Sequence, residues 1–141
     1  MSFVKVYIHA VWSTKDRYPY LNNNIHKNII THIREYAQSK SIFIDHINGG
    51  HEHLHALISM NAEQNIATIM NLLKGESSHW INKQNLTRDK FSWQDEYFAV
   101  SIGESQIDIV RKYIQDQEIH HLKRTFQQEY DEFIKNYRFD K

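Results

Sequence analysis

The chain has 141 residues, 40% of them hydrophobic and 13% aromatic, and we expect one folded globular domain over residues 1–141. It contains no cysteine, which excludes disulfides and thiolate metal sites. Lysine plus arginine equals aspartate plus glutamate at 17 each, so net charge gives no support for nucleic-acid binding, which usually shows as a basic excess. No apolar stretch approaches a membrane span, and the N-terminus lacks signal-peptide architecture, so we expect a cytoplasmic protein without a membrane partner.

Secondary structure is predicted from the spacing of apolar residues and from turn signals. β-branched and aromatic residues predict a strand over 4–12, and the helical spacing of Ile25, Ile29 and Ile33 predicts a helix over 25–39. The later elements are a strand over 42–47, a strand through the histidines of 51–58, a helix that opens at 61–64 and reaches 81, a strand near 97–101, a helix from 105 toward 117, and a helix over 125–137.

The order of these elements indicates the fold. A β-α-β-β-α-β series followed by a helix is typical of the split βαβ architecture, which is shared by ferredoxin-like and RRM-like domains. We therefore expect an α+β protein: a four-stranded antiparallel sheet with helices on one face, plus a C-terminal helix.

The most informative segment is the strand that carries three alternating histidines, His51, His53 and His55. Alternate side chains of a strand point to the same face, so His53 and His55 lie about 7 Å apart along one side. Two imidazoles so placed can share one metal ion. The apolar residues between them face the opposite side, where they pack as core; these are Leu54, Ala56 and Ile58.

A metal held by two histidines needs at least one further ligand, and the helix that begins near Ser105 offers candidates. Ile109, Tyr113 and Gln117 are spaced i, i+4, i+8 and share one helical face. The same spacing also suits a half-buried packing tyrosine and a surface glutamine, so it does not assign a function alone.

Five segments in the same order resemble the tyrosine transposases of the single-strand insertion-sequence class, the small members of the HUH nuclease superfamily. The segments are 7–17 (YIHAVWSTKDR), 52–58 (EHLHALI), 72–78 (LLKGESS), 91–101 (FSWQDEYFAVS) and 113–121 (YIQDQEIHH). The His-hydrophobic-His triplet alone is a weak signal, whereas five segments in order, spanning nearly the whole chain, are a strong one.

The resemblance implies a role for each matching residue. His53 and His55 match the metal-binding pair, Tyr113 the catalytic nucleophile on the C-terminal catalytic helix, and Gln117 the third metal ligand. His51 lies outside the pair, because Glu52 is not the hydrophobic residue that the motif has in its middle, and it fits an exposed turn. The paired histidines at 120 and 121 match the family pattern without an assigned role.

The activity that the resemblance implies is metal-dependent cleavage and rejoining of single-stranded DNA. The implied products are a 5′-phosphotyrosine link and a free 3′-hydroxyl. A divalent ion, Mg²⁺ or Mn²⁺, activates the scissile phosphate, and because the covalent link conserves the bond energy no nucleotide cofactor is needed. The implied partners are single strands with hairpins at element ends and a second copy of the chain, whose site Tyr113 could complete. Candidate DNA contacts are Lys15, Arg17 and Lys74, for which a solvated surface role is equally open.

Three alternatives remain open from the sequence. A domesticated relative would use the same chemistry on repeated genomic hairpins. A non-catalytic RRM-like module would bind nucleic acid through aromatics on its central strands, although the glycine-aromatic signature of such modules is absent. A zinc hydrolase would use His51, His53 and His55, although Ala56-Leu57 stands where common metallohydrolases have Asp-His.

Overall fold

The computed structural model describes residues 2–117 and 125–137, and it confirms the split βαβ fold. The elements are β1 (Val6–Thr14), η1 (Lys15–Arg17), α1 (Asn23–Ser39), β2 (Phe43–Gly49), β3 (His53–Met60), α2 (Ile66–Lys83), β4 (Trp93–Ile102), η2 (Glu104–Gln106), α3 (Ile107–Gln115) and α5 (Phe126–Tyr137). Among the described residues, no helix is both long and apolar enough to cross a membrane.

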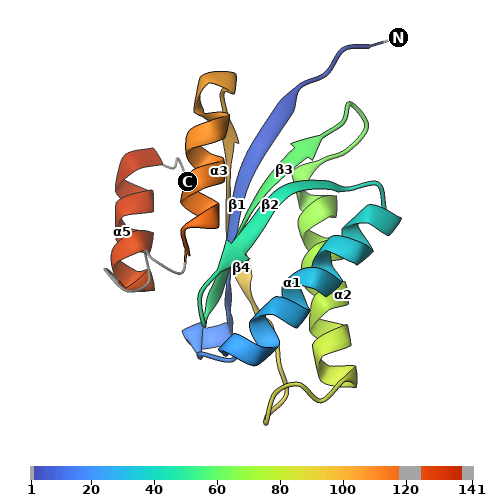
Figure 1. The fold of residues 1–141 in the computed structure, drawn as a ribbon, viewed down its shortest axis with the longest axis vertical. Coiled ribbons are helices and arrows are strands. Elements are labelled where there is room, and N and C mark those ends of the chain that lie inside the picture. The colour runs from blue at the N-terminus through green and yellow to red at the C-terminus, as the bar shows by residue number, and fades with distance from the viewer. Residues whose placement is uncertain (1, 118–124, 138–141) are drawn as a thin grey trace.

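The four strands form one sheet in the order β2-β3-β1-β4, and each neighbouring pair is antiparallel. The two crossover helices, α1 and α2, cover one face, whereas α3 and α5 lie over the other (Figure 1). In the register of the two central strands, Val11 faces His55 and Ser13 faces His53. The histidine strand is therefore central to the sheet, and its odd-numbered residues point toward α3 and α5.

Alternation along the central strands divides the apolar residues between two cores. Even-numbered residues of β1 and β3, among them Trp12 and Leu54, pack against α1 and α2 in the larger core. The smaller core, on the opposite face, seats α3 on the sheet through Leu57, Val110 and Ile114. The second core matters for function, because it fixes α3 beside the face that displays the histidines.

The largest difference from the predicted elements is β4, which begins at Trp93 and not near Tyr97. Its first half consists of buried Trp93 followed by three polar residues, Gln94, Asp95 and Glu96, so it lacks an apolar run. A register shift between Trp12 and Thr14 accommodates this half of the strand beside β1. The sequence pattern therefore predicted only the apolar end of β4.

Gly49 sits where β2 passes closest to the start of the histidine strand. An added Cβ would overlap the carbonyl oxygen of His53 and lie 2.8 Å from the Cα of Leu54. Because both atoms belong to the backbone, the strand itself must shift. We expect Gly49→Ala to lower the free energy of unfolding by about 2 kcal/mol or more, measured by urea denaturation.

Gly75 offers the matched control for that substitution. It lies in α2, it is exposed, and an added Cβ meets no heavy atom within 4 Å. Gly75→Ala should therefore raise the free energy of unfolding by about 0.5–1 kcal/mol, because alanine is the better helix former. Equal effects of the two substitutions would show that the close approach at Gly49 does not constrain the strand.

Candidate functional site

The centre of the site is the pair His53 and His55, which β3 presents on the face toward α3 and α5. Their exposed fractions are 0% and 1%, and the ring centroids lie 5.0 Å apart in an edge-on arrangement. The predicted alternation is thus observed, with Leu54, Ala56 and Ile58 fully buried in the core on the other side. Buried imidazoles require polar partners, and the surrounding elements supply them.

Glu129 of α5 is the partner common to both histidines, and the sequence analysis missed it. Its carboxylate oxygens lie 3.4 Å from His53 Nε2 and 3.0 Å from His55 Nε2, and its side chain is 7% exposed. One ligand atom each from His53, His55 and Glu129 lie within 4.8 Å of one another, close enough to share one metal ion. No sequence signal pointed to this residue among the glutamates and glutamines of α5.

Gln117 and Tyr113 also converge on this cluster. Gln117 is fully buried; its Oε1 lies 3.2 Å from His53 Nε2, and its Nε2 donates to Glu129 over 3.2 Å. The hydroxyl of Tyr113 donates a hydrogen bond to Glu129, and its ring stands edge-on to His55 with centroids 5.5 Å apart. The four residues singled out by the resemblance therefore lie together in one chain.

The route by which Gln117 reaches the cluster differs from the predicted i, i+4, i+8 face. Helix α3 ends at Gln115, with Asp116 as its C-cap, and Ile109 is 62% exposed. The buried face is instead the stripe of Ile107, Val110 and Ile114. The turn at Asp116 redirects the chain, so Gln117 points into the site even though the regular helix has ended.

His9, on β1, is a second buried residue that the sequence analysis did not place in the site. It is 3% exposed, and its Nε2 lies 2.8 Å from His55 Nδ1. Burial, together with the neighbouring His55, lowers the pKa of His9 to about 3, so the ring is neutral at physiological pH. With His9 neutral, one of the two imidazoles donates across this 2.8 Å contact and the other accepts, so the contact orients the ring of His55.

Charge in the cluster is balanced between Glu129 and His53. Burial alone would lower the pKa of His53, but its hydrogen bonds with Glu129 and Glu52 outweigh burial and raise it. Burial would likewise raise the pKa of Glu129, but the bonds from His53 and His55 outweigh it and hold that pKa far below its ordinary value. The two shifts show that His53 and Glu129 favour each other's charged forms, and a divalent ion can supply the same positive charge to Glu129.

The donor set fits a divalent metal ion. Two imidazole nitrogens, one carboxylate and one amide oxygen converge from three parts of the chain, and Glu52 holds the Nδ1 proton of His53 over 2.8 Å. This second hydrogen bond is the usual way in which a ligating histidine is oriented. Mixed nitrogen and oxygen donors admit several divalent metals and do not by themselves identify one.

A cavity of about 430 Å³ gives access to the cluster. Its lining includes Tyr113, Glu129 and His9, together with residues from the end of β4 and from α3. Because Tyr113 is half-buried while the histidines are closed off, the cavity reaches the cluster from the tyrosine side.

An ion pair fixes the orientation of α3. Arg111 donates to both oxygens of Asp45 on β2, over 2.9 and 2.7 Å. These bonds hold the pKa of the Asp45 carboxyl below its ordinary 3.8; burial opposes the shift and a bond from His46 supports it. Since a depressed carboxyl pKa stabilises the fold above the ordinary value, this stabilisation should disappear as the pH falls through the folded-state pKa, below about 4.

Asp45→Asn tests whether the Arg111–Asp45 ion pair stabilises the packing of α3. We expect the melting temperature at pH 7 to fall by a few degrees, and the difference from wild type to vanish below about pH 4. Asp108→Asn is the matched control, since Asp108 also accepts from Arg111 but its side chain is 92% exposed. Equal losses in the two variants at pH 7 would contradict the assignment of this stabilisation to Asp45.

The three candidate DNA contacts are not all on the same face of the sheet. Lys15 is exposed in η1, and Arg17 lies beside α5, where it donates to Gln127. Lys74 projects from α2 on the opposite face, where it donates to the carbonyl of Asp95 over 2.8 Å and lies over the ring of Tyr97. His51 is exposed at the turn before β3, and the paired histidines at 120 and 121 lie outside the described residues.

The fold and the cluster together define a class of protein: a split βαβ domain whose central strand presents a His-x-His pair beside a tyrosine on a following helix. A family model described as "Transposase IS200 like" matches residues 2–117. The chain therefore belongs to the IS200-like transposase family, which confirms the resemblance to tyrosine transposases. None of the curated proteins matches it in sequence.

Two solved structures are similar in fold. One is a candidate transposase from Deinococcus radiodurans R1, with a TM-score of 0.65 and 20% identity over 82% of this chain and 93% of that one. The other is a REP-associated tyrosine transposase bound to a REP hairpin, with a TM-score of 0.66 and 13% identity over 86% of this chain and 72% of that one.

Proposed function

We propose that this chain is a metal-dependent transposase that cleaves and rejoins single-stranded DNA through a 5′-phosphotyrosine intermediate at hairpin-marked element ends. The observation that carries the proposal is the convergence of Tyr113 with His53, His55 and Gln117, in a member of the IS200-like transposase family. Glu129 joins these residues as a further ligand.

The chemistry assigns a task to each side chain. A bound Mg²⁺ or Mn²⁺, held by His53, His55, Gln117 and Glu129, would withdraw charge from the scissile phosphate. A tyrosine hydroxyl is a weak nucleophile at neutral pH, since its ordinary pKa is about 10. Glu129 accepts the hydrogen bond of Tyr113, which aligns the phenolic oxygen, and the phenolic proton passes to solvent as the bond to phosphorus forms.

The covalent step conserves the phosphodiester energy. The oxygen of Tyr113 forms a bond to phosphorus, the bond from phosphorus to the 3′-oxygen breaks, and the departing 3′-oxygen takes up a proton. A 3′-hydroxyl can later attack the phosphotyrosine, which restores Tyr113 and joins new ends. The reaction therefore needs no nucleotide cofactor.

The proposed partners are single-stranded DNA with hairpins and a second copy of the chain. A hairpin ligand is supported by the similar transposase that was solved with a REP hairpin. Lys15 and Arg17 in η1, and Lys74 on the other face, are the candidates for backbone contacts, and Arg17 is the one that lies beside α5. Within the described residues, β2 and β4 end the sheet with free edges, through which two copies could join.

A covalent-capture assay tests this proposal. The protein is mixed with labelled single strands from both ends of its own genomic locus, with Mg²⁺ or Mn²⁺ or with EDTA, and separated on a denaturing gel. We expect a metal-dependent protein–DNA adduct, and peptide mass spectrometry should place the nucleotide on Tyr113. An adduct on another residue, or strand cleavage without any adduct, would refute the tyrosine mechanism.

The REP-associated neighbour also favours a second candidate, in which the same chemistry acts on repeated genomic hairpins as a domesticated function. The two candidates differ in their flanking DNA. A mobile element has matching ends around several copies of the gene, whereas a domesticated protein is encoded once and has its hairpins dispersed elsewhere. The covalent-capture assay separates the two candidates when it is run with oligonucleotides from the ends of the locus and with oligonucleotides from the dispersed hairpins.

A further inference from the structure

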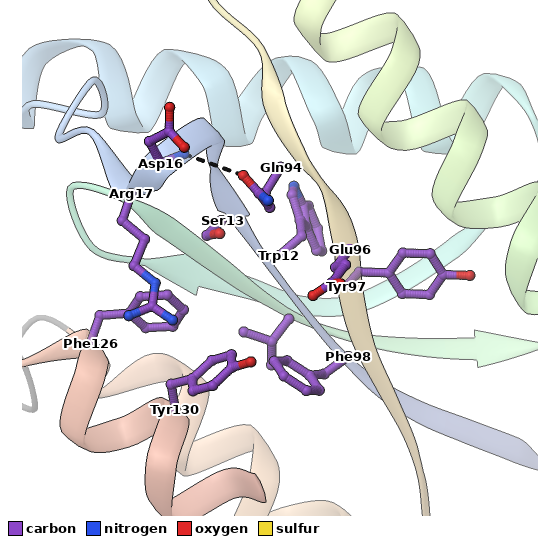
Figure 2. Close-up of a pocket in the computed structure, with 11 residues that line it drawn as sticks. Trp12, Ser13, Asp16, Arg17, Gln94, Glu96, Tyr97, Phe98, Phe126 and Tyr130 are labelled. Atoms are coloured by element: carbon purple, nitrogen blue, oxygen red, sulfur yellow. Dashed lines mark hydrogen bonds between the residues drawn. The ribbon is translucent and has the colours of Figure 1, made fainter. Parts of the chain in front are cut away.

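A second cavity, of about 310 Å³, lies beside the metal cluster and has no role in the mechanism above. It is enclosed by the end of β1, the turn η1, the first half of β4, and α5 (Figure 2). In Figure 2, Arg17, Phe126, Tyr130 and Phe98 surround one side, whereas Tyr97 points away from it. The described side chains thus form a partly aromatic hollow at the edge of the site.

The register of the sheet places this hollow next to the histidines. Ser13, which lines it, is the direct partner of His53, and Val11 is the partner of both His55 and Phe98. The hollow therefore begins about 5 Å, one strand spacing, from the histidine strand. Phe126 forms the boundary, because it lines the cavity and stacks on His53 with centroids 4.1 Å apart and planes at 13°.

The apolar walls suit a flat ring. Phe98 and Tyr130 meet edge to face, with centroids 5.0 Å apart. The guanidinium of Arg17 lies 4.6 Å from the ring centroid of Tyr130 and 5.2 Å from that of Phe126. Aromatic rings and a planar cation are the surfaces on which proteins stack unpaired nucleobases.

The polar groups of the cavity favour an uncharged ring that carries an amino group. Gln94 is held in place by its Oε1, which accepts from the backbone N–H of Asp16 over 3.3 Å, so its amide N–H groups are the part left to donate (Figure 2). The acidic residues Asp16 and Glu96 are also among the residues that line the hollow. Carboxylates repel a phosphate but accept from an exocyclic amine such as cytosine N4.

We propose that this cavity binds one unpaired nucleobase of the DNA strand, immediately beside the phosphate that Tyr113 attacks, and that it selects cytosine over thymine. Cytosine would present its N4 amine to the carboxylate of Glu96 and its ring acceptors to Gln94, whereas thymine would turn a carbonyl oxygen toward the same carboxylate. The assignment rests on the proposed action on single-stranded DNA, and it adds a reader of sequence next to the cleavage chemistry.

The test compares the binding of two matched probes, short oligodeoxycytidine and short oligodeoxythymidine. Binding to the Tyr113→Phe protein is measured by fluorescence anisotropy in the presence of Mn²⁺. We expect the cytidine probe to bind about tenfold more tightly, in line with one well-placed base contact. Glu96→Gln, at an exposed strand position, should remove most of this preference. Glu35→Gln, on α1 across the sheet, is the matched control and should retain it.

The outcomes separate this proposal from the proposed function. Equal binding of the two probes by the wild-type cavity, or an unchanged preference in Glu96→Gln, overturns the base site even if wild-type protein forms the tyrosine adduct. A preference that depends on Glu96, together with a failed capture assay, supports the base site and refutes the transposase chemistry. Melting curves of both glutamine variants exclude unfolding as the cause.

Discussion

Tyr113→Phe is expected to abolish the protein–DNA adduct, with a fall of about a thousandfold or more in strand cleavage. The substitution removes one oxygen, and that oxygen is the only atom of the side chain that can form the bond to phosphorus. DNA binding should persist, because the ring keeps its edge-on position beside His55. The measurement is the capture gel, run together with anisotropy on the same oligonucleotides.

The matched control is a variant that loses a tyrosine hydroxyl far from the cluster. Tyr36→Phe serves, since Tyr36 is half-buried on α1, across the sheet from the cluster. Adduct formation should be unchanged in Tyr36→Phe. Tyr113→Phe also loses a hydrogen bond to Glu129, which we expect to cost about 1 kcal/mol of stability and no more. An adduct that survives in Tyr113→Phe would assign the nucleophile to another residue.

Glu129→Gln is expected to weaken Mn²⁺ binding by about 10–100-fold, measured by calorimetry or by the electron paramagnetic resonance signal of free Mn²⁺. The reason is electrostatic. Glu129 brings the one carboxylate of a buried cluster whose other donors are two imidazoles and an amide, so the substitution removes the only negative charge among the proposed ligands. Cleavage should decline in parallel with occupancy of the metal site.

Asp131→Asn, on an exposed turn of the same helix, controls for a general effect on α5 and should bind Mn²⁺ like wild type. The opposite result for Glu129→Gln is equally informative. Tighter Mn²⁺ binding by that variant would show that the carboxylate competes with the ion for the histidines and does not help to hold it.

The strand-borne half of the site was predictable from the sequence, because a period of two fixes the direction of a side chain without any knowledge of the rest of the fold. His53 and His55 are opposite Leu54 and Ala56 for that reason alone. The element order likewise predicted the sheet. Tyr113 and Gln117 needed the family resemblance, since a spacing of four residues on a helix is common in packing residues.

The rest of the site depends on tertiary contacts that no local pattern encodes. His9 reaches His55 only through the pairing of β1 with β3, and Glu129 reaches the cluster from a helix that lies beyond residues 2–117, the part matched by the family model. Gln117 lies beside His53 although the helix expected to carry it ends two residues earlier. Contacts such as these, between neighbouring strands or with a helix distant in sequence, are seen only in the folded structure.

Helix α5 contributes Glu129 to the cluster, and it contributes Phe126, three residues earlier, and Tyr130, the next residue, to the adjoining hollow. One short helix therefore bears on both the proposed metal site and the proposed base site. Any substitution that slides or rotates this helix alters both sites together. A lineage that changes its target sequence through α5 must therefore restore its metal site at the same time, whereas changes in β4, at Gln94 or Glu96, leave the ligands in place and offer the freer path to new targets.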